Sequence, residues 1–374
     1  MQKQLRMIVI LTGATGTLGS NVLYELLKTK FNEVTAIYLL VREKGSTAPE
    51  ERIRKMLSSD YAPDSIKNNI DHVFEKVNVI SSQDFLNPSS FLDKNKSAPT
   101  YFIHSAGYVN LSVRPEDEKE IFDLNFGFST SLFEAYKDYI SKFVYISTAF
   151  SAGDIGGMMH NEYPDEATTQ YRNYYEKAKH ATEIFLKNAT KEKGIPLQIL
   201  RPSVLGGNSI EQPSFFISKY MVFYLFAKFF YRCTSLDSIR ISANSKTGLN
   251  IIPTDYAAKV IVKVFESDIL QLNIVHSKGT NIVSGIAKIM ETVGFNNFSI
   301  QSDTSHDAGT YNGLEKFYYS TIGVHLEPYL RSKPYEWDTT LLESILPIPT
   351  YDLEEYLVNT VAYAKTKGFR NQNW

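Results

Sequence analysis

A glycine-rich segment near the start of the chain constrains the fold more than any other feature. Residues 7–19 read MIVILTGATGTLG, a short apolar run that leads into Gly13, Gly16 and Gly19. The apolar run suits a strand that is buried on both faces of a parallel sheet. Gly13 allows a tight turn, Gly16 lets the main chain approach a ligand, and Gly19 lets the next helix pack closely on the strand.

The helix expected after this turn directs its first amides, and the positive end of its dipole, at whatever lies over the glycines. The segment therefore predicts a site for the pyrophosphate of a dinucleotide, and chance glycines in a structural turn are the alternative. The contacts that we expect are Gly13, Thr15, Gly16, Thr17, Leu18 and Gly19.

The composition of the chain narrows the classes of function. Its 374 residues carry 39 Lys and Arg against 41 Asp and Glu, a balance that favours neither nucleic acid nor an anionic membrane as a partner. Cys233 is the only cysteine, which excludes an internal disulfide or a cysteine-based zinc cluster and suits a reducing compartment. The seven histidines show no metal spacing, and the apolar run 7–11 is too short for a signal peptide. We expect a cytoplasmic protein without a metal; the sequence makes no prediction of oligomeric state.

Strand-like and helix-like stretches alternate through the first half of the chain. This order predicts an α/β protein, a Rossmann-type doubly wound parallel sheet, with a smaller and mostly α-helical substrate lobe. We expect the cofactor domain to cover residues 1–206, with 247–275 returning to it, and the lobe to cover 207–246 and 276–374. The later strands are expected at 34–41, 70–77, 100–103, 142–146 and 197–200, and helices at 121–133 and 171–186.

Residues 215–231 read FFISKYMVFYLFAKFFY and are almost entirely apolar. Lys219 and Lys228 interrupt the run, which falls short of the roughly 20 residues that span a bilayer. We expect a buried or tunnel-lining helix, and an interfacial membrane contact is the alternative.

Two residues with acid–base chemistry lie four positions apart in one predicted helix. Tyr175 and Lys179 therefore project from the same face. A nearby ammonium favours the ionised form of a tyrosine, so the pair fits a proton donor and the group that tunes it. The strand before this helix ends in Ser147 and Thr148, where hydroxyls face the ligand crevice of an open sheet. A solvated helix face is the alternative.

The end of the second strand bears on the choice of cofactor. A carboxylate there would accept from the ribose 2′-hydroxyl of NAD, whereas a 2′-phosphate requires a cation. The strand ends in Arg42, and Arg52 follows in the next helix. Because guanidinium forks suit phosphate, we predict NADPH as the cofactor, with Arg42 as an ordinary surface charge being the alternative.

Several motifs together resemble the extended short-chain dehydrogenase/reductase family in order and spacing. They are TGATGTLG at 12–19, HSAGYVN at 104–110, ISTAF at 146–150, YEKAK at 175–179 and LRPSVLGG at 200–207. YLLVRE, ERIRKML and NIIPTDYAA point more narrowly to the thioester reductases, including the fatty acyl-CoA reductase or male-sterility branch. The resemblance covers residues 7–280 and fades in the C-terminal lobe.

The resemblance implies roles for individual residues. Tyr175 would donate a proton to the carbonyl oxygen, Lys179 would hold the nicotinamide ribose, and Thr148 would bind the developing oxyanion. Asn125 would hold a water near the lysine, with a structural role as the alternative. The remaining cofactor contacts implied are Asn78 and Val79 near adenine, Ser105, Ala106 and Gly107 near the pyrophosphate and ribose, and Pro202, Ser203 and Val204 beside the nicotinamide. In the family, the position of Asn78 often holds an acidic residue, and the position of Ala178 often holds a serine.

The resemblance implies an enzyme that reduces an acyl thioester, bound to CoA or to a carrier protein, to an aldehyde, with a further reduction to an alcohol left open. The aromatic run 215–231 would line the acyl channel. Two alternatives remain. One is an epimerase, dehydratase or hydroxysteroid-type dehydrogenase acting on a sugar nucleotide or a free alcohol or ketone, and the other is a non-catalytic NADP-sensing protein.

Overall fold

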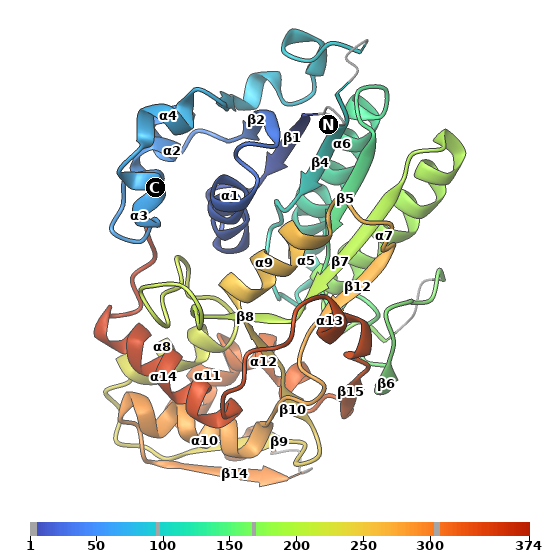
Figure 1. Ribbon diagram of the computed structural model, residues 1–374. Coiled ribbons are helices and arrows are strands. Elements are labelled where there is room, and N and C mark those ends of the chain that lie inside the picture. The colour runs from blue at the N-terminus through green and yellow to red at the C-terminus, as the bar shows by residue number, and fades with distance from the viewer. Residues whose placement is uncertain (1–5, 95–97, 167–169, 303–306) are drawn as a thin grey trace.

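The computed structural model describes residues 6–94, 98–166, 170–302 and 307–374. Its centre is a parallel seven-stranded sheet in the order β12-β7-β5-β4-β1-β2-β3 (Figure 1). The strands are β1 Met7–Thr12, β2 Val34–Leu40, β3 Val77–Ile80, β4 Thr100–His104, β5 Lys142–Ile146, β7 Leu197–Pro202 and β12 Gln271–Ile274. The predicted Rossmann-type α/β fold is confirmed. The order reverses between β1 and β4, the place where open parallel sheets bind ligands.

Alternate residues of β1 enter two different hydrophobic cores, because successive side chains of a strand point to opposite faces. Val9 and Leu11 belong to the core that includes α1 and α9, whereas Ile8 and Ile10 belong to the core that includes α6 and α7. The helices of the first face are α1 Thr17–Thr29, α2 Pro49–Leu57 and α9 Thr254–Val264, and those of the second are α5 Pro115–Phe122, α6 Phe128–Tyr136 and α7 Tyr174–Lys193. Both faces are covered, which explains the continuous apolar run of β1.

The prediction of a strand over 70–77 is wrong. Residues 70–74 form helix α4 (Ile70–Phe74), after α3 (Asp64–Lys67), and the strand begins only at Val77. Ile70, Val73 and Phe74 are spaced three and four residues apart, so they lie on one helical face and pack against the first core. The expected strand is therefore shifted by several residues toward the C-terminus.

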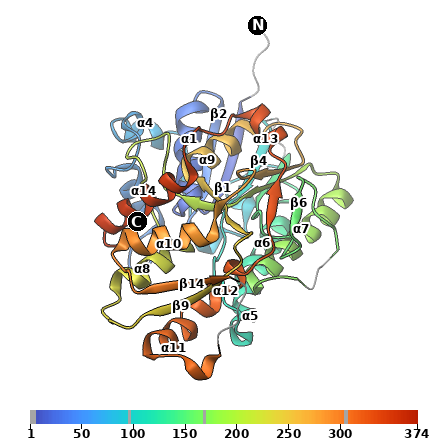
Figure 2. The same cartoon turned by 90° about the horizontal axis from the view of Figure 1, so that it is seen from below.

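The second half of the chain builds a separate hydrophobic core (Figure 1, lower part). Helix α10 (Ile282–Val293) packs against α8 (Phe223–Arg232) and α14 (Leu353–Thr366). The other elements are α11 Gly313–Ser320, α12 Gly323–Leu330, α13 Thr340–Ile345 and the strand pairs β9 Ile239–Ala243 with β14 Phe298–Ser302, β10 Gly248–Leu249 with β13 Thr280–Asn281, β8 Val204–Gly206 with β11 Ile251–Pro253, and β6 Gly157–Met159 with β15 Tyr335–Trp337. Helix α9 lies against α1 (Figures 1 and 2). The domain boundaries given above stay a prediction.

The aromatic run 215–231 is only partly helical. Helix α8 starts at Phe223, and residues before it include Phe215 and Val222 with positive φ values of 62° and 53°. A β-branched residue at positive φ is strained, and it interrupts a helix. Phe226 and Phe230 are buried in the second core. In the described ranges, no helix is long and apolar enough to cross a bilayer; the interfacial alternative stays a prediction.

Candidate active site

The glycine turn forms a close-fitting cradle at the carboxyl end of β1. Gly13 has a φ of +73°, and a Cβ on it would lie 2.8 Å from the amide nitrogen of Ala106. A Cβ on Gly19 would overlap the carbonyl of Gly13. Gly16 sits at the N-cap of α1 and has no side chain to cap it, so the amides of Thr17 and Leu18 face outward as an anion-binding helix start.

A buried polar chain joins this turn to the loop after β4. Thr12 Oγ1 accepts from the Ala106 amide (3.0 Å) and contacts His104 Nδ1 (2.7 Å), while His104 Nε2 contacts Ser129 Oγ (2.8 Å). Burial lowers the pKa of His104 to about 3, so the imidazole is neutral at pH 7. His104 is a core residue whose hydrogen bonds are satisfied, and it fixes the loop 105–107.

Two predicted cofactor contacts have buried hydroxyls without a partner in the part of the chain that the structure describes. They are Ser105 Oγ, in the loop after β4, and Ser203 Oγ, directly after β7. Pro202 accepts a hydrogen bond from the amide of Ala149 (3.0 Å), and the amide of Val204 donates to Asn250 (3.3 Å). A buried hydroxyl without a partner needs a reason, and the polar groups of a dinucleotide at this edge of the sheet would satisfy both. The chain therefore fits the predicted cofactor.

Arg42 and Arg52 lie together at the end of β2. Arg52 donates to the carbonyl of Arg42 (2.5 Å), to Thr15 Oγ1 in the glycine turn (3.0 Å) and to the carbonyl of Trp374 (3.0 Å). Arg42 is exposed, and the neighbouring Glu43 accepts from Ser82 instead (2.6 Å). The structure thus brings the two predicted arginines to the glycine turn.

Asn78 and Val79 do not follow a strand, as the expected strand at 70–77 implied, and their contact with adenine stays a prediction. Both residues lie inside β3 and pair with Tyr38 and Leu39 of β2. Asn78 is exposed and donates to the carbonyl of Lys76 (3.2 Å). The strand ends at Ile80, because residues 70–74 form a helix instead of starting the strand.

Lys179 is buried at the carboxyl end of β5. Its ammonium donates to the carbonyl of Ile146 (2.8 Å) and lies 4.5 Å from the centre of the Tyr145 ring. A Cβ on Gly107 would lie 3.6 Å from the Lys179 Nζ. Burial lowers the pKa of Lys179 to about 7. Thr148, which follows the same strand, is half-buried.

Tyr175 differs from the expectation that a nearby ammonium lowers its pKa. Burial and the carboxylate of Glu176 raise the pKa of Tyr175 above its usual value. Burial also disfavours the charged form of Lys179, which removes the source of the expected effect. In this structure the tyrosine is held in its protonated form, the form that a proton donor requires.

Asn125 lies in a π-helical turn, residues 123–127. Its side chain accepts from the amide of Tyr108 (3.0 Å) and donates to the carbonyls of Tyr108 (3.0 Å) and Ile121 (2.9 Å). These bonds fix the loop next to Gly107, so Asn125 acts on the backbone in this structure. Such turns are frequent at functional sites.

A buried ion pair beneath Lys179 was not predicted from the sequence. Glu183 binds Arg201 through both oxygens and accepts from Ser147 (2.5 Å) and Ser151 (2.8 Å). Burial opposes ionisation, but Arg201 and the two hydroxyls keep the pKa of Glu183 below its usual value. The signal was available, because Glu183 follows Lys179 by four residues and shares its helix face.

The second lobe is attached to α7 beside Tyr175. Tyr329, from α12, donates to the buried carboxylate of Glu176 (2.7 Å) and accepts from Asn173 (2.7 Å). Arg172 pairs with the same carboxylate (2.9 Å). The neighbours of the tyrosine are therefore fixed by residues from both halves of the chain.

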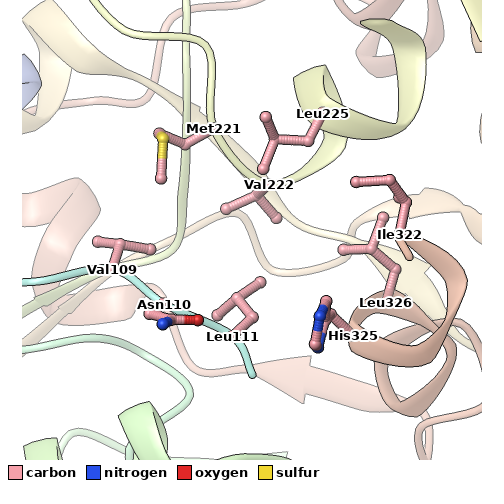
Figure 3. Close-up of a pocket in the computed structure, with 9 residues that line it drawn as sticks. All are labelled: Val109, Asn110, Leu111, Met221, Val222, Leu225, Ile322, His325 and Leu326. Carbon is pink, nitrogen blue, oxygen red and sulfur yellow. The ribbon is translucent and has the colours of Figure 1, made fainter. Parts of the chain in front are cut away.

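An apolar cavity of about 120 Å³ lies between the loop after β4 and the second lobe (Figure 3). Three short segments wall it: Val109, Asn110 and Leu111; Met221, Val222 and Leu225; Ile322, His325 and Leu326. His325 Nδ1 is buried without a partner among the described residues. The cavity is smaller than a typical ligand pocket, so it has room for part of an apolar group.

The sheet order, glycine cradle and strand-end residues define a dinucleotide-binding protein of the Rossmann type. A family model described as male sterility protein, an NAD-binding domain, matches residues 11–261. The chain belongs to this family. This confirms the predicted class, an NAD(P)H-dependent oxidoreductase of the extended short-chain dehydrogenase/reductase type, in its thioester reductase branch.

The individual relatives agree with this assignment. Fatty acyl-CoA reductase 1 of Mus musculus is 37% identical over 75 residues, which is 20% of this chain and 14% of that protein. Fatty acyl-CoA reductase 2 of Mus musculus is 27% identical over 147 residues, 38% of this chain and 28% of that protein. The matched stretches thus span less than a third of those relatives.

Solved structures with the same fold include two reductase domains. The terminal R domain from the myxalamid PKS-NRPS pathway has a TM-score of 0.69 at 20% identity and covers 99% of this chain and 93% of its own. The reductase domain of the aureusimine biosynthetic cluster has a TM-score of 0.67 at 17% identity, with coverages of 98% and 93%. At these identities the likeness concerns the fold, and it extends over the C-terminal lobe.

Proposed function

We propose that this protein reduces an acyl thioester, bound to CoA or to a carrier protein, with NADPH. One observation carries the proposal. The loop that follows β4 passes Lys179 at Gly107 and then forms one wall of the apolar cavity with Val109 and Leu111. A substrate with an apolar chain in the cavity therefore has its polar end directed toward Lys179.

The side chains at the strand ends would act on the carbonyl oxygen of the thioester. When bound, NADPH supplies a hydride to the carbonyl carbon. Tyr175 would donate its phenolic proton to the oxygen, and Thr148 would donate a hydrogen bond where negative charge develops. The resulting thiohemiacetal then breaks its carbon–sulfur bond, and the hydroxyl proton passes to the leaving sulfur, which releases the aldehyde and the thiol of CoA or of the carrier protein. Lys179, whose amine is positioned by the carbonyl of Ile146, would hold the ribose hydroxyls of the cofactor.

The cavity supports an apolar acyl group over a sugar nucleotide. Seven of its nine lining residues are apolar, and Asn110 and His325 supply its polar side chains. A nucleotide sugar would need more polar partners than these two residues offer. Met221, Val222 and Leu225 come from the aromatic run, in agreement with an acyl channel in that segment.

The arginines at the end of β2 support NADPH over NADH. Arg42 is exposed beside the glycine turn, and Arg52 Nε has no partner in the described residues. Glu43, the carboxylate nearest in sequence, is engaged by Ser82. Free guanidinium donors suit the 2′-phosphate that distinguishes the two cofactors.

The test is NADPH oxidation with a panel of acyl-CoA and acyl-carrier-protein substrates, with the aldehyde or alcohol product identified by mass spectrometry. We expect turnover with at least one thioester and a preference for NADPH. Activity on a free sterol or sugar nucleotide, together with none on any thioester, would overturn the proposal in favour of the alternative enzymes. Cofactor binding with no turnover on either group would favour the NADP-sensing alternative.

A further inference from the structure

A further cationic side chain, that of Lys219, lies beside Arg42 and Arg52 at the end of β2. Lys219 belongs to residues 215–222, which precede α8 in the second half of the chain. It is half-buried, and burial together with the positive charges of Lys44, Arg52 and Arg42 lowers its pKa. The main-chain geometry agrees, because residues 371 and 372 bind the main chain on both sides of Lys219 while the carbonyl of Trp374 accepts from Arg52. The segment that carries Lys219 therefore lies beside the cations at the end of β2.

No ion pair of the described ranges neutralises this cluster. Among the ion pairs of the described residues, none includes Arg42, Lys44, Arg52 or Lys219, and the carboxylate of Glu43, which favours the charged form of Arg52 from a distance, is bound by Ser82. Arg52 is satisfied in part by neutral oxygens of Arg42, Thr15 and Trp374. Like charges that are partly removed from water repel one another, and a bound anion would relieve that repulsion.

The main chain holds Lys219 at this place from both sides. Ser218 accepts from the amide of Gln372 (2.8 Å), and the amide of Tyr220 donates to Asn371 (2.8 Å). Ser218 Oγ also reaches Thr17 Oγ1, at the first residue of α1 (3.5 Å). The main chain on both sides of Lys219 is thus held near the glycine turn.

We propose that Lys219 determines cofactor specificity by binding the 2′-phosphate of NADPH together with Arg42 and Arg52. The inference rests on the proposed use of NADPH. The 2′-phosphate is favoured over the pyrophosphate because the three cations that act on Lys219 all belong to the β2 end and α2. The pyrophosphate instead faces the uncapped amides at Thr17 and Leu18. The second lobe thereby contributes to recognition of the adenosine end of the cofactor.

The test uses ligands that cannot undergo the reaction. Adenosine 2′,5′-bisphosphate and adenosine 5′-diphosphate carry equal numbers of phosphates, but only the first has the 2′-phosphate. Calorimetric titration of the wild type, Lys219→Met and Lys219→Arg should show about tenfold weaker binding of the bisphosphate to the Met variant. Binding of the diphosphate should change less than about twofold, and the Arg variant should retain most of the affinity.

A matched control separates this effect from a general loss of charge. Lys246, an exposed lysine of the same lobe, is replaced in Lys246→Met, which should bind both ligands like the wild type. Lys219→Met should also melt at the same or a higher temperature without ligand, because it removes a partly desolvated cation. A smaller ligand-induced rise in melting temperature, for the bisphosphate alone, would support the proposal.

Other results would overturn it. Equal loss for both ligands, or loss for the diphosphate alone, would assign Lys219 to the pyrophosphate. Unchanged binding of the bisphosphate would remove Lys219 from the site while leaving the NADPH preference intact. If the wild type itself binds both ligands equally, the NADPH preference is wrong as well, and thioester turnover with NADH then decides the remaining part of the proposed function.

Discussion

The two ends of the proposed cofactor site balance buried charge in opposite ways. Beneath Lys179, Glu183 and Arg201 are both fully buried and neutralise each other through two hydrogen bonds. At the end of β2, the positive charges of Lys44, Arg42 and Arg52 act on Lys219, and the carboxylate of Glu43 acts on Arg52 without forming an ion pair with it in the described chain. The charges of the first end are paired within the folded chain, whereas we propose that an anionic ligand completes the second. We call the region around Lys179 and Glu183 the catalytic end, and the region around Arg42 and Lys219 the phosphate end. Substitutions should affect folding at the catalytic end and ligand binding at the phosphate end.

The largest effect is expected for Glu183→Gln. The amide keeps the shape but leaves the buried Arg201 guanidinium without a counter-charge, which costs about 3–5 kcal/mol. The midpoint of urea unfolding, measured without ligand at pH 7, should fall accordingly. Glu50→Gln is the matched control, because its pair with Arg54 is exposed and should contribute less than about 1 kcal/mol. Equal midpoints for both variants would contradict the contrast between the two ends.

Tyr175→Phe should separate chemistry from binding at the catalytic end. Loss of the phenolic proton is expected to lower kcat by about 10² to 10⁴-fold, while the affinity for NADPH and the melting temperature stay near those of the wild type. Stopped-flow fluorescence of bound NADPH gives the affinity, and aldehyde formation gives kcat. Turnover at the wild-type rate would remove Tyr175 from the proposed mechanism.

Arg42→Ala should change ligand choice at the phosphate end without changing stability. The ratio of NADPH affinity to NADH affinity should fall about tenfold, because one charge-assisted contact to phosphate is lost. Arg54→Ala removes an exposed arginine of α2 and should leave the ratio unchanged. An unaltered ratio in Arg42→Ala would reduce that residue to an ordinary surface charge.

Residues that are close together in the sequence could be predicted, whereas residues that only the fold brings together could not. Tyr175 and Lys179 lie four residues apart in one helix, and Gly13 to Gly19 form one turn, so local spacing was enough to predict them. Lys219 joins Arg42 only through the tertiary fold, and its neighbours are fixed by Asn371 and Gln372 more than 150 positions later. No local pattern links such residues.

The local sequence pattern also gave a wrong prediction where packing in the folded chain selects the secondary structure. The apolar residues between 70 and 77 are compatible with a strand or a short helix, and their packing into the first core selects the helix. Val222 illustrates the reverse case, since a continuous apolar run gave no sign of the positive φ that delays α8 until Phe223. Sequence reasoning therefore gave the sheet but not the geometry of residues 215–222.

The last prediction concerns the pH dependence of folding at Lys179. Burial lowers its pKa to about 7 in the folded chain, against about 10.5 when unfolded. Between these values the unfolded chain binds a proton that the folded chain has released, so Lys179 makes stability rise with pH, by at most about 1.4 kcal/mol per pH unit. The free-energy cost of burying the charged amine is therefore full below pH 7 and is lost as the pH rises toward 10.

Lys179→Met abolishes this titration, so its stability relative to the wild type should be greatest near pH 6 and decline steadily up to pH 9. Urea unfolding of both proteins at intervals of one pH unit measures the difference, in which the titrations that they share cancel. Lys246→Met, at an exposed position, should follow the wild type throughout. Parallel curves for Lys179→Met and the wild type would mean that the buried amine keeps its proton over this pH range, with the nearby carboxylate of Glu183 as its counter-charge.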